Sequence, residues 1–183
     1  MAVQDASALI DLLNGGVLAI WCGLGIQTLI TDFVLEEIDQ EDQRRVLDTL
    51  VEAGLLEVHT TASKHLSALV ELRERHRISL PDASTIQLAR SESAVLLCGD
   101  ARMRKTALEM GVPVCGVLWI CDMLVWEGAL TPAQAAVTLE KILAGGAHLP
   151  PVECAQRLSE WTNDKRRQPR NPWSNCPGNR GAP

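Results

Sequence analysis

Acidic side chains stand at four places in this 183-residue chain where they could share a cation. Asp5 and Asp100 each follow a short apolar run that is typical of a buried strand. Asp82 lies at the head of a predicted helix, and Glu37 lies on the first turns of another. Crowded carboxylates repel one another unless a cation lies between them, and their oxygens are the ligands that Mg²⁺ prefers. Taken singly, however, each aspartate is equally suited to cap a helix N-terminus, and Glu37 to face solvent beside Glu36.

The elements that must position these acids alternate along the chain. Short apolar runs predict strands that end at residue 4 and cover residues 26–30, 55–59, 94–98 and 112–115. Amphipathic segments between and after them predict helices over residues 6–13, 17–21, 31–38, 42–53, 63–75, 80–89, 100–110, 117–126, 132–143 and 152–161. Strands separated by such helices predict a three-layer α/β/α sandwich with a central, mainly parallel sheet. Because ligands bind outside the carboxyl ends of parallel strands, the four acids are expected at one edge of the sheet.

Length and charge divide the chain into a body and a tail. The length fits one domain over residues 1–162, followed by a flexible basic tail over residues 163–183 that is rich in Arg, Pro, Asn and Gly. All 23 acidic residues lie at or before Asp164, whereas five of the 17 basic residues follow it. A body this acidic argues against a protein that grips nucleic acid mainly through a basic surface.

Several other classes of protein are disfavoured. The six cysteines form no C-x-x-C pair, so we expect buried free thiols in the cytoplasm rather than a zinc site. The uncharged stretch over residues 12–31 contains four glycines, which favours turns over a membrane span. The N-terminus has no basic region typical of a signal peptide. Phosphate-binding and nucleophile-elbow glycine motifs are absent as well.

Four segments together resemble a known family, the PIN-domain nucleases. Residues 5–10, 31–38, 80–89 and 95–104 resemble the family's four motifs in order, and the resemblance covers about residues 1–125. In the second motif a valine stands three residues before the glutamate, as Val34 does here, which selects Glu37 over Glu36. The resemblance implies a metal site formed by Asp5, Glu37, Asp82 and Asp100, holding one or two Mg²⁺ or Mn²⁺ ions.

The same resemblance implies a metal-dependent endoribonuclease that hydrolyses phosphodiester bonds of RNA. Arg102, Arg104 and Lys105 are candidate phosphate contacts, although exposed helix charges of this kind are usually only solvated. The small size favours the toxin of a toxin–antitoxin pair, with an antitoxin and a second copy of the chain as protein partners. The helices over residues 116–162 exceed what a minimal toxin needs.

Two other functions stay open. Cys98 stands where the family often has Thr or Ser, two residues before the last Asp, and the first strand is very short. Both features are compatible with a binding or scaffold protein whose metal site is weak. The same site would also serve a structure-specific DNA nuclease, although no clamp or arch segment is evident in the sequence.

Overall fold

A five-stranded parallel sheet lies at the centre of the computed structural model, which describes residues 1–169 and 171. Every neighbouring pair of strands is parallel, in the order β3-β2-β1-β4-β5. The strands are β1 (Ala2–Gln4), β2 (Thr28–Thr31), β3 (Glu57–His59), β4 (Val95–Leu97) and β5 (Val114–Cys115). The predicted α/β fold with a mainly parallel sheet is confirmed, and the strand that carries Asp5 is central.

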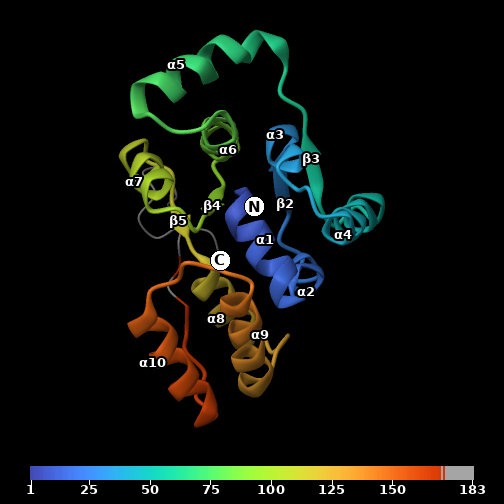
Figure 1. Cartoon of the computed structure of the whole chain (residues 1–183), viewed down its shortest axis with the longest axis vertical. Helices are drawn as coiled ribbons and strands as arrows, with labels where there is room; N and C mark the ends of the chain where they lie inside the picture. The colour runs from blue at the N-terminus through green and yellow to red at the C-terminus, as the bar shows by residue number, and fades with distance from the viewer. Residues whose placement is uncertain (170, 172–183) are drawn as a thin grey trace.

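Helices cover both faces of this sheet (Figure 1). One face packs against α1 (Ala6–Gly15), α2 (Leu18–Cys22), α4 (Glu41–Glu52), α8 (Val117–Trp126) and α9 (Pro132–Ala144), with α10 (Pro151–Thr162) packed on α9. The other face packs against α6 (Leu80–Ser91) and α7 (Ala101–Glu109), and α5 (Leu66–His76) lies on α6. These layers form the predicted sandwich.

Each central strand sends its side chains alternately into two separate cores, as the two-residue period of a strand requires. Ala2 packs in the core beneath α1 and α8, whereas Val3 packs in the core beneath α6 and α7. Val3 lies opposite Leu29 on one side and Leu96 on the other, so β1 is flanked by strands at both edges. Asp5, which follows β1, therefore lies at the end of the middle strand of the sheet.

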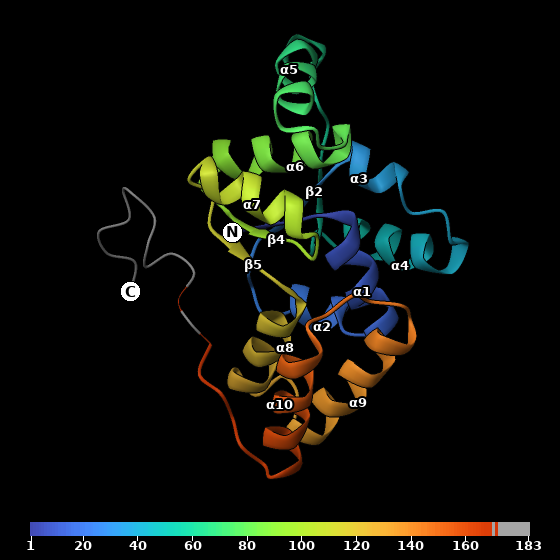
Figure 2. The same cartoon turned by 60° about the vertical axis from the view of Figure 1, so that its left-hand side comes forward.

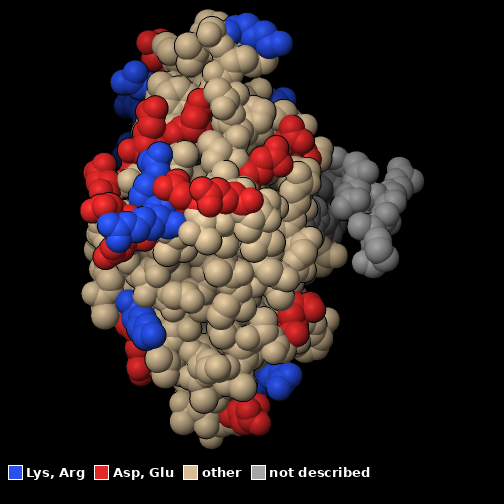
Figure 3. All heavy atoms as spheres, turned by 90° about the vertical axis from the view of Figure 1, so that its right-hand side faces the viewer, with Lys and Arg blue, Asp and Glu red and all other residues tan. Residues whose placement is uncertain are grey.

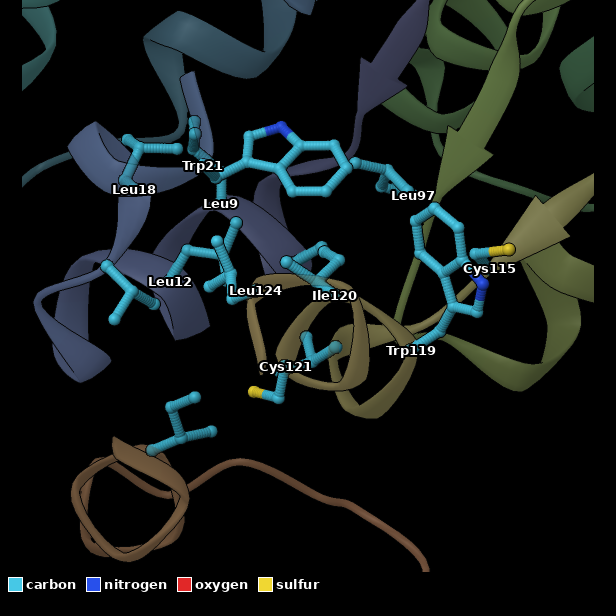
Figure 4. Packing of buried hydrophobic residues seen from close by; sticks show 14 of the residues in the cluster. Leu9, Leu12, Leu18, Trp21, Leu97, Cys115, Trp119, Ile120, Cys121 and Leu124 are labelled. Atoms are coloured by element: carbon cyan, nitrogen blue, oxygen red, sulfur yellow. The ribbon is translucent and has the colours of Figure 1, made fainter. Parts of the chain in front are cut away.

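The core beneath α1 and α8 is built around two tryptophans (Figure 4). The rings of Trp21 and Trp119 meet edge to face with 6.0 Å between their centroids, a favourable arrangement for aromatic pairs. The Trp21 Nε1–H donates to Thr28 Oγ1 at 3.1 Å, which satisfies its one polar group. Aliphatic side chains of α1 and α8 complete this core, among them Leu9, Leu12, Ile120 and Leu124.

Several predicted elements differ from the structure in their bounds. The predicted strand over residues 26–30 begins two residues later and ends one residue later, and the predicted helix over residues 63–75 is divided into a 3₁₀ turn (Ser63–His65) and α5. The predicted helix over residues 31–38 ends early, because α3 spans only Asp32–Glu36. At this end the Arg44 guanidinium donates to the Leu35 carbonyl at 2.8 Å. In a longer helix, that carbonyl would accept a backbone N–H of the next turn.

Charged side chains of both signs share the surface near α4 (Figure 3). Arg44 and Arg45 form ion pairs with acids of their own helix, so the positive charges on this face are locally neutralised. Within the described ranges, no helix is long and apolar enough to cross a membrane. The predicted basic tail over residues 163–183 lies largely outside the described residues. Its first part is tied to the body, since Arg167 binds the Glu160 carboxylate at 2.8 Å.

Candidate metal centre

Asp5 follows β1 directly and begins α1 as its N-cap residue. One carboxylate oxygen accepts the Ala8 backbone N–H at 2.7 Å, and the other accepts the Ser7 hydroxyl at 2.9 Å. The Asp5 backbone N–H donates to the Leu97 carbonyl at 3.0 Å, so the end of β1 is fixed to the end of β4. Only 4% of Asp5 is exposed, and its carboxylate is thus both buried and held in one orientation.

Asp100 stands three residues after the end of β4, as the N-cap residue of α7. Its carboxylate accepts the Met103 backbone N–H at 2.7 Å. Two side chains connect it to Asp5. The Ser7 hydroxyl accepts the Gly99 N–H at 3.2 Å, and the Cys98 thiol, beside the Asp5 carboxylate, donates to the Asp100 carbonyl at 3.5 Å. The carboxyl ends of β1 and β4 therefore bring the first and last acid to one edge of the sheet.

Asp82 and Glu37 reach this edge through a contact between α6 and β2. Asp82 forms a capping box with Ser79: its carboxylate accepts the Ser79 N–H at 3.1 Å, and the Ser79 hydroxyl accepts the Asp82 N–H at 3.0 Å. Two residues later, the Ser84 hydroxyl lies 2.9 Å from the hydroxyl of Thr31, the N-cap residue of α3. Glu37 ends α3 as its C-cap residue. The Thr31–Ser84 bond thus holds the helix that carries Asp82 against the helix that carries Glu37.

The pKa values of Asp5 and Glu37 are both raised, in part by neighbouring carboxylates. Burial is the main cause that raises the pKa of Asp5, and the negative charge of Asp82 raises it further. Hydrogen bonds from Cys98, Ala8 and Ser7 oppose this rise. The pKa of Glu37 is raised by burial, then by the charges of Asp82 and Asp5. Three acids from three separate segments therefore lie within each other's electrostatic field.

A hard divalent cation fits the chemistry of this group, because its oxygen donors are carboxylates whose repulsion a cation would remove. The carboxylates of Asp5, Asp82 and Asp100 are at the same time turned toward backbone N–H groups that they cap. In these orientations, no three His, Cys, Asp or Glu side chains of residues 1–169 and 171 are placed to hold one ion. The structure therefore shows the capping role of the three aspartates, and the shared metal site stays a prediction.

The three candidate phosphate contacts occupy different surroundings. Arg104 is half-buried, and its Nη1 donates to the Cys98 carbonyl at 3.0 Å, directly beside the acidic edge. Gly116 leaves room for this guanidinium, since a Cβ there would lie 3.2 Å from Arg104 Nη1. Arg102 donates instead to the Arg77 carbonyl, and Lys105 is exposed beside Glu109. Among these three, Arg104 is the cation that the fold fixes next to the acids.

Two residues near the site were not identified from the sequence. Ser7 binds Asp5 and Gly99 together, and its only signal was a hydroxyl in the first turn after a capping aspartate. Asp11 lies on α1, where burial and the charge of Asp5 raise its pKa to about 6, against an opposing effect of His148. No local pattern marked Asp11, because only the packing of the last helices buries it.

Comparisons with known proteins show the family of the chain. The sequence matches the profile of DUF3368, described as a PIN domain, over residues 1–163. PAE2754 from Pyrobaculum aerophilum, a crystal structure, aligns with a TM-score of 0.49 and 18% identity over 70% of this chain and 97% of its own. No curated protein matches the sequence significantly. The family match covers nearly the whole described chain, including all four acids, and the chain therefore belongs to the PIN-domain family, whose members are generally metal-dependent nucleases.

Proposed function

We propose that the chain is a Mg²⁺- or Mn²⁺-dependent endoribonuclease whose metal is held by Asp5, Glu37, Asp82 and Asp100. The observation that carries this proposal is the placement of the acids at the carboxyl edge of the sheet: Asp5 is buried there after β1, and the Thr31–Ser84 bond holds the helix of Asp82 against the helix of Glu37. Folding these charges together is unfavourable unless a cation compensates them. Asp100 joins the group through the bonds of Ser7 and Cys98.

A divalent ion at this place supplies a bound water of lowered pKa and neutralises charge on the scissile phosphate. The chain's own residues provide the orientation. The Ser7 hydroxyl and the Ala8 N–H each donate to one oxygen of the Asp5 carboxylate, so its orientation is fixed by the chain itself. Arg104 keeps a guanidinium beside the acids, anchored by the Cys98 carbonyl, and contacts a phosphate oxygen there. An isolated fixed cation suits a body that otherwise carries excess negative charge.

Calorimetric titration with Mn²⁺ tests the metal site directly. The native chain is expected to bind Mn²⁺, and D5N and D100N are each expected to lose that binding while keeping the native far-ultraviolet circular dichroism. The control is D48N, since Asp48 is an exposed carboxylate of α4. A folded native chain that binds no Mn²⁺ would favour the scaffold protein. Binding that D5N leaves unchanged would place the metal elsewhere.

Cleavage assays then test the substrate. An end-labelled RNA and a DNA of the same sequence are incubated with Mn²⁺ and either native protein or D5N. Cleavage of RNA alone, lost in D5N, is the expected result. Equal cleavage of both strands would favour the DNA nuclease, and cleavage that persists in D5N would indicate a contaminating enzyme.

We further propose that the chain acts as a toxin in the cytoplasm. Its protein partners are an antitoxin and a second copy of the chain. Apolar side chains on α5 support it, because Leu66 and Val70 remain 39% and 40% exposed. Expression of the native chain is expected to arrest growth, whereas D5N is not. Light scattering is expected to give a dimer mass that L66E/V70E lowers, and a native monomer would exclude the second copy.

A further inference from the structure

Two arginines near the start of α7 are held by backbone carbonyls on different sides of that helix. Arg102 Nη1 donates to the Arg77 carbonyl at 3.2 Å, and Arg104 Nη1 donates to the Cys98 carbonyl at 3.0 Å. Residues two apart in an α-helix point about 200° away from each other. In Figure 2, α7 lies between α6 and β5. Arg102 therefore reaches the chain that leads into α6, whereas Arg104 reaches the ends of β4 and β5.

The carbonyls that anchor these arginines stand close in sequence to the acids that begin α6 and α7. The carbonyl bound by Arg102 stands two residues before the N-cap residue of α6, to which the Asp82 carboxylate is bonded. The carbonyl bound by Arg104 stands two residues before Asp100, the N-cap residue of α7. Because the two side chains leave α7 in nearly opposite directions, Asp100 has an anchored arginine on each side.

Both guanidinium groups keep most of their hydrogen-bond donors for a ligand. A guanidinium carries five N–H donors, and each of these two gives one to a carbonyl oxygen. No ion pair joins either of them to an acid within residues 1–169 and 171, a range that contains all 23 acidic residues. Lys105, which lies between them in the sequence, is paired with Glu109. Two arginines that are anchored but unpaired beside a group of carboxylates suit an external anion.

We propose that Arg102 and Arg104 bind two phosphates of one RNA strand, one on each side of the phosphate that is cut. The inference rests on the proposed ribonuclease function. Guanidinium groups bind phosphate through paired N–H donors, and both groups have donors left for this. A strand held at two phosphates has the bond between them at the metal centre, whereas a strand that ends at the metal reaches only one arginine. The chain therefore cuts within a strand and acts poorly at its ends.

The salt dependence of RNA binding counts the phosphate contacts. The full chain is titrated into a fluorescently labelled RNA strand in EDTA, where no metal-dependent cleavage takes place, and anisotropy is followed at several salt concentrations. For a single strand, each neutralised phosphate adds about 0.7 to the slope of log affinity against log salt. R102A and R104A are each expected to reduce this slope by about 0.7, and the double variant by about 1.4. An R102A slope equal to the native slope would overturn the proposal.

The matched control is R90A. Arg90 is an exposed arginine in the last turn of α6, at the end of that helix away from Asp82. It forms no ion pair among the described residues either, so R90A removes the same charge at a different place. The slope for R90A is expected to equal the native slope. A reduction as large as that of R102A would show that net charge rather than position matters, and would contradict the proposal.

RNA with one neutral phosphate tests both contacts even if an arginine variant does not fold. A methylphosphonate replaces one phosphate at a time, and each strand is incubated with the native chain and Mn²⁺. Cleavage is expected to slow by about tenfold when either neighbour of the scissile phosphate is neutral, the effect of one hydrogen bond to a charged group. In R102A one of these two positions should lose its effect, and in R104A the other. Equal sensitivity at every position of the strand would refute the two contacts.

Binding and cleavage together separate this proposal from the ribonuclease function itself. If RNA binding in EDTA depends on both arginines but Mn²⁺ produces no cleavage, the two phosphate contacts are supported and the nuclease function is contradicted. If RNA is cut but binding in EDTA is absent or independent of the arginines, the nuclease function is supported and the two contacts are contradicted.

Discussion

Asp11 lies in an unfavourable place for a charge, and removing that charge should stabilise the protein in a pH-dependent way. The residue is only 9% exposed on α1, and its pKa is raised from 3.8 to about 6 by burial and by Asp5, against an opposing effect of His148. The variant D11N keeps the shape of the side chain and removes its ionisation. The gain in stability therefore measures what ionised Asp11 costs the folded state.

The sign and size follow from the two pKa values. The folded chain holds the Asp11 proton more tightly than the unfolded chain, so stability falls as the pH rises from about 4 to about 6. Above pH 7 the carboxylate is ionised in both states, and the full cost is present. A shift of about two pKa units corresponds to about 3 kcal/mol. D11N should therefore raise the free energy of unfolding by up to about 3 kcal/mol at pH 8 and change little at pH 4.

Urea denaturation followed by tryptophan fluorescence measures this difference. Native protein and D11N are compared at several pH values between 4 and 8, with D48N as a matched change at an exposed carboxylate of α4. D48N should show no such dependence on pH. A gain from D11N that is the same at pH 4 and pH 8, or a loss at pH 8, would refute the assignment of a raised pKa to Asp11.

Two further predictions concern buried polar groups. D122A leaves the Arg157 guanidinium buried without its carboxylate and should lower the free energy of unfolding by about 3–5 kcal/mol, measured by urea denaturation, whereas D122L/R157M should cost much less. If D122A lowered the free energy of unfolding less than the double variant, an unpaired Arg157 would not be the cause of the destabilisation. Gln4 is fully buried, and neither of its amide atoms has a hydrogen-bond partner among the described residues. Q4M should therefore raise the free energy of unfolding by about 1–3 kcal/mol, seen as a higher melting temperature, and a lower one would show that the amide is satisfied.

Much of the fold could be predicted because its signals are local. Apolar runs and amphipathic periods predicted each strand and helix, and a parallel sheet follows from their alternation. Asp5 and Asp100 were identifiable because each begins a helix just after a parallel strand, and such residues lie at the sheet's carboxyl edge. Glu37 was harder to place. Its helix ends one residue before it, and this end depends on a side chain of another helix, Arg44.

The sequence by itself therefore determined the layers and the acids that follow strands, since backbone period and capping chemistry act within a few residues. Only the tertiary structure decided which side chains meet across long separations. Thr31 and Ser84 are 53 residues apart, and their bond brings Asp82 toward Glu37. Asp122 and Arg157 are 35 residues apart and form a buried ion pair between α8 and α10. Such contacts depend on how whole helices pack, and no local pattern carries that information.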